Sequence, residues 1–217
     1  KCRQDLNFQC KMKLSEPSLD NLINLISRLP GLGPKSARRI ALHLLKNKEN
    51  LMKPLSDALA NAHTKISRCS ICGAIKSLDV NCTITKCHYI NNSYDQLCVV
   101  ENIADMWAME ATNIYKGHYH ILGGTLSAMN GSDPQALLID SLIDRVKKNN
   151  INEVIIATSA TIEGQTTAFY INDSLKNLGI KVTKLAHGLP VGSEIEYLDD
   201  GTLFSAFKYR NSVNDNK

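Results

Sequence analysis

The spacing of apolar residues predicts that the first third of the chain is helical. Three sets of apolar residues recur at intervals of three and four positions, which is the spacing of one helix face. The sets are Leu19, Leu22, Ile23 and Ile26, then Ala37, Ile40, Ala41, Leu44 and Leu45, and then, after Pro54, Leu55, Ala58, Leu59, Ala62 and Ile66. Ser18 is placed to cap the first helix. Residues 1–16 have no such pattern, and we expect a disordered extension there.

The pattern changes after about residue 97, where short apolar runs alternate with helical periodicity. Strands are expected at 97–101, 118–122, 153–158 and 180–185, and helices at 104–113, 133–148 and 165–178. The second of these helices has Pro134 near its first position, where proline is favoured. Alternation of this kind with short connections indicates a parallel sheet covered by helices. Turn signals at Gly188, Gly192 and Asp200-Gly201 then precede a short C-terminal helix.

Composition narrows the kind of protein. Hydrophobic residues make up 43% of 217 residues, so the chain can form a packed core and global disorder is excluded. No apolar run reaches the roughly 18 residues of a membrane span, and the N-terminus lacks the apolar core of a signal peptide. We therefore expect a cytoplasmic protein with no membrane partner. In a reducing compartment, the seven cysteines are expected to be metal ligands or buried thiols, not disulfides.

Charge is distributed unevenly along the chain. The formal net charge is +4, yet residues 28–53 contain seven Lys or Arg and a single acid, Glu49. A local basic segment on a nearly neutral protein suggests contact with a polyanion. From charge alone, a solvated helix face is the alternative.

The segment LPGLGP, residues 29–34, joins the first two predicted helices within this basic region. Gly31 and Gly33 permit a tight turn and a close approach of the backbone to a ligand. Pro34 suits the first turn of the helix that follows. The N–H groups and partial positive charge at the start of that helix can bind a phosphate.

Three cations, Lys35, Arg38 and Arg39, lie off the apolar stripe of the second helix and are expected to face outward beside the hairpin. A glycine hairpin followed by a basic helix resembles the helix-hairpin-helix motif, which binds nucleic acids without sequence specificity. The resemblance implies that the three cations and the two glycines contact backbone phosphates of DNA and do not contact bases. An ordinary packing corner with a basic surface is the alternative.

Four cysteines have the spacing of a structural zinc site. Cys69-x2-Cys72 and Cys82-x4-Cys87 are two short pairs separated by nine residues, and Gly73 lets backbone amides approach the thiolates. Four protein ligands leave no open coordination position. The expected ion is therefore a structural Zn²⁺, one per chain, that stabilises the fold and does not catalyse.

The second cysteine pair is wider than usual, and His88 or His63 could replace one of its thiolates. Four buried or unpaired thiols are the alternative to a metal site. Cys98 lies in an apolar strand and is expected to be a small core residue.

The stretches CVVE, HYHILGG and ATSATIEGQ, which end successive strands, resemble the toprim domain of topoisomerases, primases and several nucleases. In catalytic toprim domains a Glu ends the first strand, and two aspartates in Ala-Thr-Asp-x-Asp-x-Glu-Gly bind Mg²⁺ for phosphoryl transfer. Glu101 and Glu163 match the two glutamates, whereas Ser159 and Thr161 stand at the aspartate positions. Neutral hydroxyls are poor ligands for a hard divalent cation, so we predict no catalytic residue here.

The order of these features, with the stretch AHGLPVGSEIEYLDDGTL, resembles the bacterial recombination mediator family RecR from about residue 18 to 210. The resemblance implies an α+β protein of several modules. They are a helix-hairpin-helix domain at 17–66, a zinc-finger module at 67–92, an α/β toprim domain with a parallel sheet at 93–186, and a short C-terminal segment at 187–217.

The resemblance also implies a function. RecR proteins act in recombinational DNA repair with RecO and RecF, help to load RecA on single-stranded DNA, and assemble as dimers and ring-like tetramers. It implies binding to single- and double-stranded DNA without sequence specificity, and no small-molecule substrate. Lys35 and Arg39 fall at DNA-contacting positions of the family. Glu101 and the loop from Ser159 to Glu163, with Thr161, fall on the toprim face used for partner contact.

Two other functions stay open at this point. A Mg²⁺-dependent toprim nuclease or phosphoryl transferase would explain Glu101 and Glu163, but its further metal ligands are not identified. An assembly protein whose hairpins make only self-contacts would bury the hairpin cations against acids of a neighbour. The missing aspartates favour a non-catalytic DNA-binding mediator.

Overall fold

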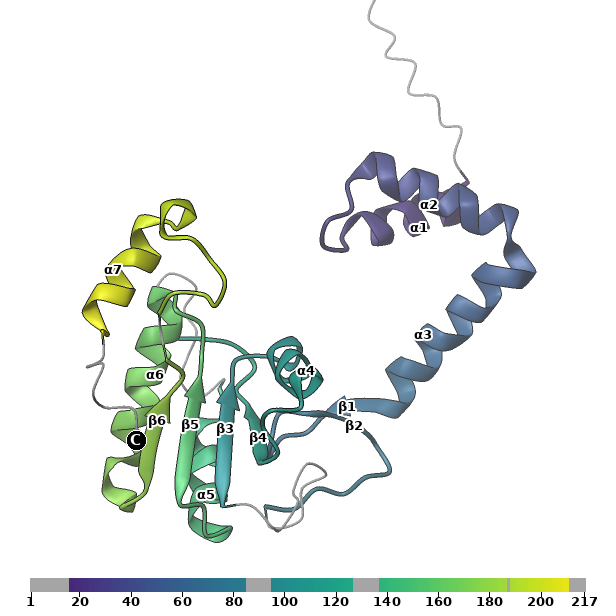
Figure 1. Ribbon diagram of the computed structural model, residues 1–217. Helices are drawn as coiled ribbons and strands as arrows, with labels where there is room; N and C mark the ends of the chain where they lie inside the picture. Colours follow the sequence, from purple (N-terminus) through teal and green to yellow (C-terminus); the bar gives the residue numbers. More distant parts are fainter. Residues whose placement is uncertain (1–15, 85–94, 127–136, 187, 211–217) are drawn as a thin grey trace, which may run out of the picture. The chain divides into compact units, whose positions relative to one another are not determined.

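The computed structural model describes residues 16–84, 95–126, 137–186 and 188–210 (Figure 1). The chain divides into two compact units, residues 1–64 and 65–217, which we call unit 1 and unit 2. The predicted N-terminal extension, apart from Glu16, lies outside the described residues, and so does the predicted helix start at Pro134. No helix in the described part of the chain has both the length and the apolar character needed to cross a membrane.

Unit 1 contains the helical hairpin that the sequence predicts. Helix α1 (Pro17–Ser27) packs on α2 (Pro34–Lys46), and a π-helical turn, η1 (Lys48–Met52), leads into α3 (Lys53–Lys65). The core of this unit is formed by residues of the predicted apolar stripes, namely Ile26, Ala37, Ala41 and Leu44. The predicted cap was wrong: α1 begins one residue before Ser18, and the carboxylate of Glu16 accepts the Ser18 N–H at 3.2 Å.

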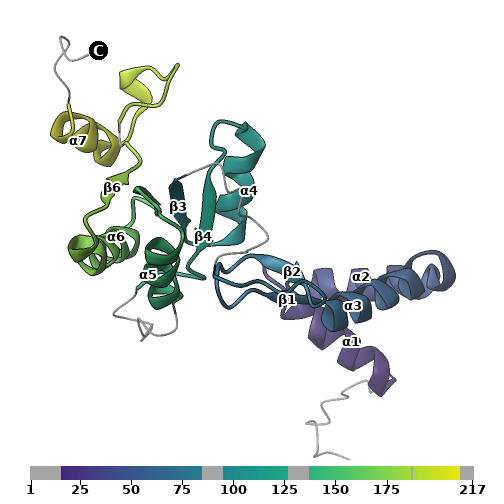
Figure 2. The ribbon, with the colours of Figure 1, turned by 90° about the horizontal axis from the view of Figure 1, so that it is seen from below.

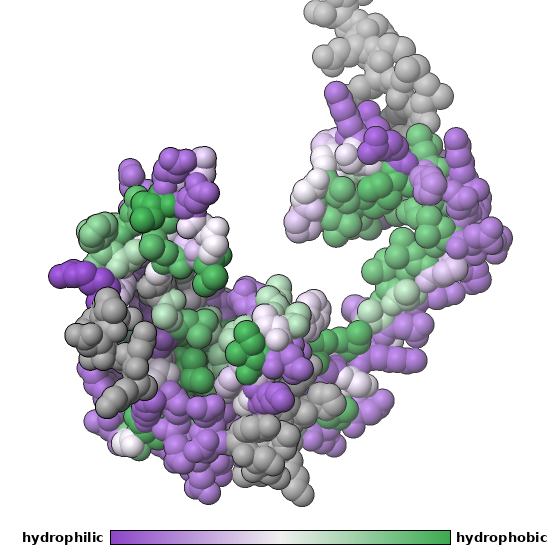
Figure 3. Space-filling model, in the orientation of Figure 1, coloured by the Kyte–Doolittle hydropathy of each residue, from purple (hydrophilic) through white to green (hydrophobic). Residues whose placement is uncertain are grey.

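Helix α3 has the predicted apolar stripe but does not bury it. None of its residues is buried, and Leu55 and Leu59 are 43% and 64% exposed. Hydrophobic side chains are accordingly visible along this helix in Figure 3. The stripe predicts the helix correctly, but the pattern alone does not say what covers it.

Unit 2 is built on a four-stranded parallel sheet in the order β4-β3-β5-β6, as the alternating pattern predicts. The strands are β3 (Gln96–Val100), β4 (His118–Ile121), β5 (Glu153–Ala157) and β6 (Lys181–Lys184). Strands β3 and β5 lie in the middle, and Val100 is opposite Ala157, so their carboxyl ends are adjacent. Strands β4 and β6 form the two edges (Figure 1).

Helices cover both faces of this sheet (Figure 2). Helices α5 (Ile139–Lys148) and α6 (Ile162–Leu175), the latter followed by the 3-10 turn η3 (Lys176–Leu178), pack on one face, where Leu142, Val146 and Ile171 meet Val99 and Val154. Helix α4 (Ile103–Thr112) lies on the other face, where Met106 packs against Cys98 and Val100. Burial of Cys98 as a core residue is confirmed.

Several elements differ from the sequence-based expectations. A short antiparallel ribbon, β1 (Ile66–Arg68) and β2 (Ile75–Ser77), was not predicted. Ile66, which the apolar spacing assigned to the third helix, is the first residue of β1. The C-terminal part contains η4 (Ile195–Tyr197) and the expected short helix, α7 (Asp200–Lys208). Asp200-Gly201 is the first turn of α7 and not a separate turn, because Asp199 caps the helix by accepting the Thr202 N–H at 3.0 Å.

Two polar side chains are buried beneath the sheet edge at β4. His120 is fully buried and Arg145 is 2% exposed. The Nη1 of Arg145 lies 2.7 Å from the carbonyl oxygen of Tyr119 and 3.2 Å from Nδ1 of His120. The Nε2 of His120 lies 2.9 Å from the carbonyl oxygen of Leu138, so the neutral ring donates at Nε2 and accepts at Nδ1. Burial, reinforced by the charge of Arg145, lowers the pKa of His120 to about 3.

Acid should therefore destabilise unit 2 through His120. The pKa of a histidine in the unfolded chain is about 6.5, so between that pH and about 3 the unfolded chain binds a proton that the folded chain excludes. The free energy of unfolding should fall by up to about 1.4 kcal/mol per pH unit for this one group, and the group should contribute no pH dependence above neutrality. Urea unfolding at several pH values, with His120→Gln as comparison, measures the slope. Equal slopes between pH 4 and 6 in the two proteins would contradict this role of His120.

Candidate nucleic-acid interface and strand-end site

The turn between α1 and α2 leaves the start of α2 open. Gly31 has a φ of +76°, a left-handed conformation that favours glycine, and Gly33 is the extended N-cap of α2. No side chain caps α2, and a Cβ at either glycine would meet no atom within 4 Å. The two glycines are therefore not required for internal packing, and they leave room for a ligand to approach the backbone.

The electrostatics of this turn favour an anion. The first turn of α2 contains no acid that would offset the partial positive charge of the helix start. Lys35, Arg38 and Arg39 are exposed, whereas Ala37 between them is buried, so the cations lie on the outer face as predicted. Within the described residues, none of the three makes an ion pair. A phosphate at the turn would meet backbone N–H groups and unpaired cations together.

The strand-end site lies in unit 2, where β3 and β5 finish side by side. Glu101 follows β3, and Oε1 of its carboxylate accepts the backbone N–H of Ser159 at 2.6 Å. A Cβ on Gly164 would lie 2.9 Å from this oxygen and 2.4 Å from the Ser159 carbonyl oxygen, so the glycine is required for close packing. The structure thus brings Glu101 and the loop after β5 together, and the carboxylate is used to fix the loop.

The two residues at the aspartate positions serve the start of α6. The hydroxyls of Ser159 and Thr161 lie 2.7 Å apart and hydrogen-bond to each other. Thr161 is the N-cap of α6, and its hydroxyl accepts the Gly164 N–H at 3.1 Å. Glu163 is exposed in the first turn of the helix. Among the described residues, the site therefore presents the hydrogen-bonded carboxylate of Glu101, the exposed carboxylate of Glu163 and two paired hydroxyls, which is a poorer set of ligands for Mg²⁺ than one with carboxylates at both aspartate positions.

The cysteine knuckle forms the turn between β1 and β2. Cys69 and Cys72 are 2% and 1% exposed, Gly73 has a φ of +76°, and the N–H of Ile71 points at Sγ of Cys69 at 3.4 Å. Backbone N–H donors directed at a cysteine sulfur suit a metal-bound thiolate. Cys82 packs against the same cluster. These features fit part of a zinc site.

The remaining predicted ligands do not complete the site within the described residues. Cys87 and His88 lie outside them, and His63 is exposed on α3. No three potential metal-ligating side chains come together in the described parts of the chain. The zinc ion therefore stays a prediction.

The knuckle also covers the β4 edge of the sheet, which sequence reasoning missed. The N–H of Ile121 donates to the carbonyl oxygen of Cys72 at 2.8 Å, and Nη2 of Arg68 donates to the carbonyl oxygens of Ile121 and Leu122 at 3.1 and 2.8 Å. A Cβ on Gly73 would lie 1.9 Å from the Ile121 carbonyl oxygen. In the sequence, Gly73 is the local feature that this contact requires. Next to two cysteines, however, a glycine is already explained by the approach of backbone amides to the thiolates, so the contact with β4 was not predicted.

Comparison with known proteins finds family models for three parts of the chain and relatives over most of its length. The family model described as "Toprim domain" matches residues 95–186, "RecR, helix-hairpin-helix" matches 19–63, and "RecR, C-terminal" matches 188–211. A protein of Pelagibacter ubique (strain HTCC1062) named "Recombination protein RecR" is 56% identical over 198 residues, covering 91% of this chain and 96% of the relative. Proteins with the same name from Sinorhizobium medicae (strain WSM419) and Bartonella bacilliformis (strain ATCC 35685 / KC583 / Herrer 020/F12,63) are 46% identical over 201 residues and 50% identical over 197 residues. They cover 93% and 91% of this chain, and 98% and 96% of the relatives.

Removing the Glu101 carboxylate should release the loop after β5. In Glu101→Ala the Ser159 N–H has no acceptor, and we expect the free energy of unfolding to fall by about 1–3 kcal/mol. Glu101→Gln retains an acceptor oxygen and should keep most of that stability. Urea unfolding measures the loss, and amide hydrogen exchange at Ser159 reports whether the loop has opened. A slow Ser159 amide in Glu101→Ala would show that the carboxylate does not fix the loop.

Proposed function

The chain belongs to the RecR family of recombination proteins, and on that premise we propose that it is a non-catalytic DNA-binding mediator of recombinational repair, acting in the cytoplasm. The observation that carries the proposal is the turn between α1 and α2. There an uncapped helix start and three exposed cations without ion-pair partners among the described residues face the same open space.

DNA binding at this turn would be directed at the backbone. Gly31 and Gly33 let a phosphate approach the N–H groups of α2, and Lys35, Arg38 and Arg39 supply the neutralising charge. Such contacts read no bases, so single- and double-stranded DNA are both suitable ligands. Binding of this kind releases counterions and weakens steeply with salt.

The strand-end site supports the absence of phosphoryl-transfer activity. A Mg²⁺-dependent nuclease or transferase needs carboxylates that are available to the metal. Glu101 is engaged by the Ser159 N–H, and Ser159 and Thr161 engage each other. Among the described residues of this loop, Glu163 is the carboxylate that makes no hydrogen bond.

The proposed partners come from the family. We propose that the chain acts with RecO and RecF to help load RecA on single-stranded DNA, and that it forms a dimer or a ring-like tetramer. On the strand-end face, we propose that Ser159, Thr161 and Glu163 contact a partner and that Glu101 positions the loop that carries them, a role that its bond with the Ser159 N–H supports. The exposed apolar residues of α3 and α7, including Leu59, support burial of additional surface by assembly (Figure 3).

We also propose a structural zinc ion with Cys69, Cys72, Cys82 and Cys87 as ligands. When bound, it would cross-link the knuckle and stabilise the part of unit 2 that packs against β4. Burial of the first two thiols and the N–H directed at Cys69 support this assignment. Residue 88, a histidine, is the alternative fourth ligand.

The hairpin predicts a specific loss of DNA affinity. Lys35→Glu with Arg39→Glu should weaken binding and should reduce the slope of log K against log salt by about 2, because each substitution removes one cation from a phosphate. Lys147→Glu with Lys148→Glu, two exposed cations of α5, changes the net charge equally and is the matched control. Fluorescence anisotropy of labelled DNA over a salt series measures both. An unchanged slope in the hairpin variant, or an equal change in the control, would show that the hairpin does not contact DNA.

The zinc assignment predicts the outcome of metal analysis. The purified protein should contain about one zinc per chain, and Cys72→Ser should release the ion and unfold at a lower urea concentration. Cys98→Ala removes another buried thiol and should retain the zinc, so it serves as the control. A wild-type protein purified without zinc, or a Cys72→Ser variant that keeps it, would refute the assignment.

A further inference from the structure

The two edges of the parallel sheet differ in whether their outward backbone groups have hydrogen-bond partners. At β4 three outward backbone groups have partners, because the Tyr119 carbonyl oxygen accepts from Arg145, the Ile121 N–H donates to Cys72, and the Ile121 carbonyl oxygen accepts from Arg68. Exposed strand edges attract other strands, and natural proteins usually cover them. The knuckle does so at β4.

The other edge, at β6, has no such cover among the described residues. The parallel register directs Lys181, Thr183 and Leu185 toward β5, as the bonds from Lys181 N–H to the Asn152 carbonyl oxygen (2.9 Å) and from Leu185 N–H to the Ile156 carbonyl oxygen (3.1 Å) show. The N–H and carbonyl groups of Val182 and Lys184 consequently point outward. In the described parts of the chain, no backbone or side-chain group bonds to them.

A groove runs beside this open edge. It has a volume of about 270 Å³ and lies between β6 and α6. Its apolar lining includes Ile156, Ala168, Val182 and Phe169, and the ring of Phe169 is 70% exposed. In an extended chain every second side chain points to the same face. A strand added to β6 would therefore place an apolar side chain in the groove while its backbone pairs with Val182 and Lys184.

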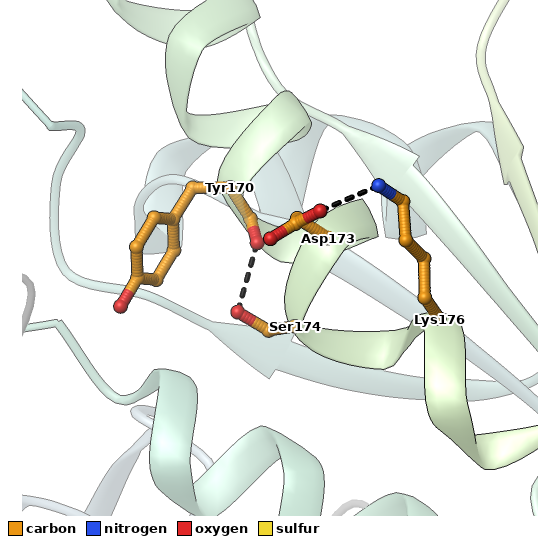
Figure 4. A network of polar contacts seen from close by, with 4 residues as sticks. All are labelled: Tyr170, Asp173, Ser174 and Lys176. Carbon is orange, nitrogen blue, oxygen red and sulfur yellow. Dashed lines mark hydrogen bonds and ion pairs between the residues drawn. The ribbon is translucent and has the colours of Figure 1, made fainter.

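The charge at the edge selects the kind of strand. Two lysines near this edge already form ion pairs. Lys176 is paired with Asp173 at 2.5 Å at the exposed end of α6, where the Ser174 hydroxyl also donates to the Tyr170 carbonyl oxygen (Figure 4). Lys181 is paired with Glu153 at 3.3 Å. Lys184 lines the groove and makes no ion pair within the described residues. Lys184 is therefore available to pair with a negatively charged group of a ligand in the groove.

A second copy of this edge offers Lys184 no counter-charge. In an antiparallel pair of β6 strands the outward residues lie opposite one another, so Lys184 would face Ile180, Val182 or Lys184 of the other copy, and none of these is acidic. Like charges directly opposite each other on paired strands are destabilising. An acidic strand has the complementary charge.

We propose that the β6 edge and its groove bind an extended acidic peptide segment of a partner protein as a fifth strand. Main-chain hydrogen bonds to Val182 and Lys184 supply affinity, an aliphatic side chain in the groove beside Phe169 supplies a pocket contact, and a carboxylate meets Lys184. This inference goes beyond DNA binding by the hairpin. It rests on unit 2 alone and does not depend on the proposed function.

The test uses a fluorescein-labelled peptide of about six residues, the usual length of a strand, in which pairs of aliphatic residues separate aspartates. Two control peptides have lysine for aspartate, or proline at two interior positions, which keeps the charge and removes main-chain donors. With the full chain, the acidic peptide should bind saturably below about 1 mM, and both controls should bind at least about tenfold more weakly.

Matched variants locate the site. Lys184→Glu should weaken acidic-peptide binding about tenfold, and Phe169→Ala should weaken it severalfold. Lys148→Glu and Ile114→Ala change an exposed cation and an 85% exposed apolar residue away from the groove, and should bind within twofold of wild type. Lys184→Glu should leave DNA binding unchanged, and Lys35→Glu with Arg39→Glu should leave peptide binding unchanged.

Four results would overturn the inference. One is the absence of saturable binding of the acidic peptide. Another is equal binding of the proline peptide, which would mean attraction by charge without strand pairing. The third is an equal loss of peptide binding in Lys148→Glu and Lys184→Glu, which would mean that the peptide does not bind at β6. The fourth is slow amide exchange at Val182 and Lys184 in the free protein, which would mean that the edge is not open.

Discussion

The hydrogen bond from the Ser159 N–H to the Glu101 carboxylate is the contact on which the functional interpretation of unit 2 depends. It joins the ends of the two central strands at the place where parallel sheets commonly carry their chemistry. The carboxylate of Glu101 thus has a structural role, because it fixes the backbone of the loop after β5. The hydroxyls of Ser159 and Thr161 then complete the start of α6 by bonding to each other and to Gly164. The loop keeps a defined conformation without requiring a cation.

The two units consequently offer different kinds of binding surface. Unit 1 presents cations and an uncapped helix start, which suit phosphate groups wherever they occur along a nucleic acid. Unit 2 presents the ordered strand-end loop and a sheet with one covered edge and one edge that is open among the described residues. In the proposed mediator, DNA and protein partners would bind to surfaces on different units, so substitutions at one surface should leave binding at the other unchanged.

Much of this could be predicted from the sequence because the signals are local. Helical spacing located α1 and α2, and alternating apolar runs located all four parallel strands within about two residues, the usual uncertainty of element ends.

The site residues Glu101, Ser159 and Thr161 were found by their position after strands. Their mutual bonds were not, because a contact between residues 101 and 159 has no local signature. The same holds for Arg68, whose bonds to Ile121 and Leu122 decide which sheet edge is covered. Helix α3 differs, because its apolar spacing predicted the helix correctly but could not predict whether its apolar side chains are buried. Their burial depends on what packs against the helix, which the spacing does not specify.

We propose that the strand-end site of unit 2 is a binding surface that performs no metal-dependent chemistry. The most direct measurement is DNA binding by the wild-type protein with Mg²⁺ and without it, at matched ionic strength, followed by gel analysis of the DNA. We expect salt-sensitive binding that is the same in both conditions, with the DNA intact. Mg²⁺-dependent cleavage or joining of the DNA would contradict it and would show that Glu101 and Glu163 serve a metal after all.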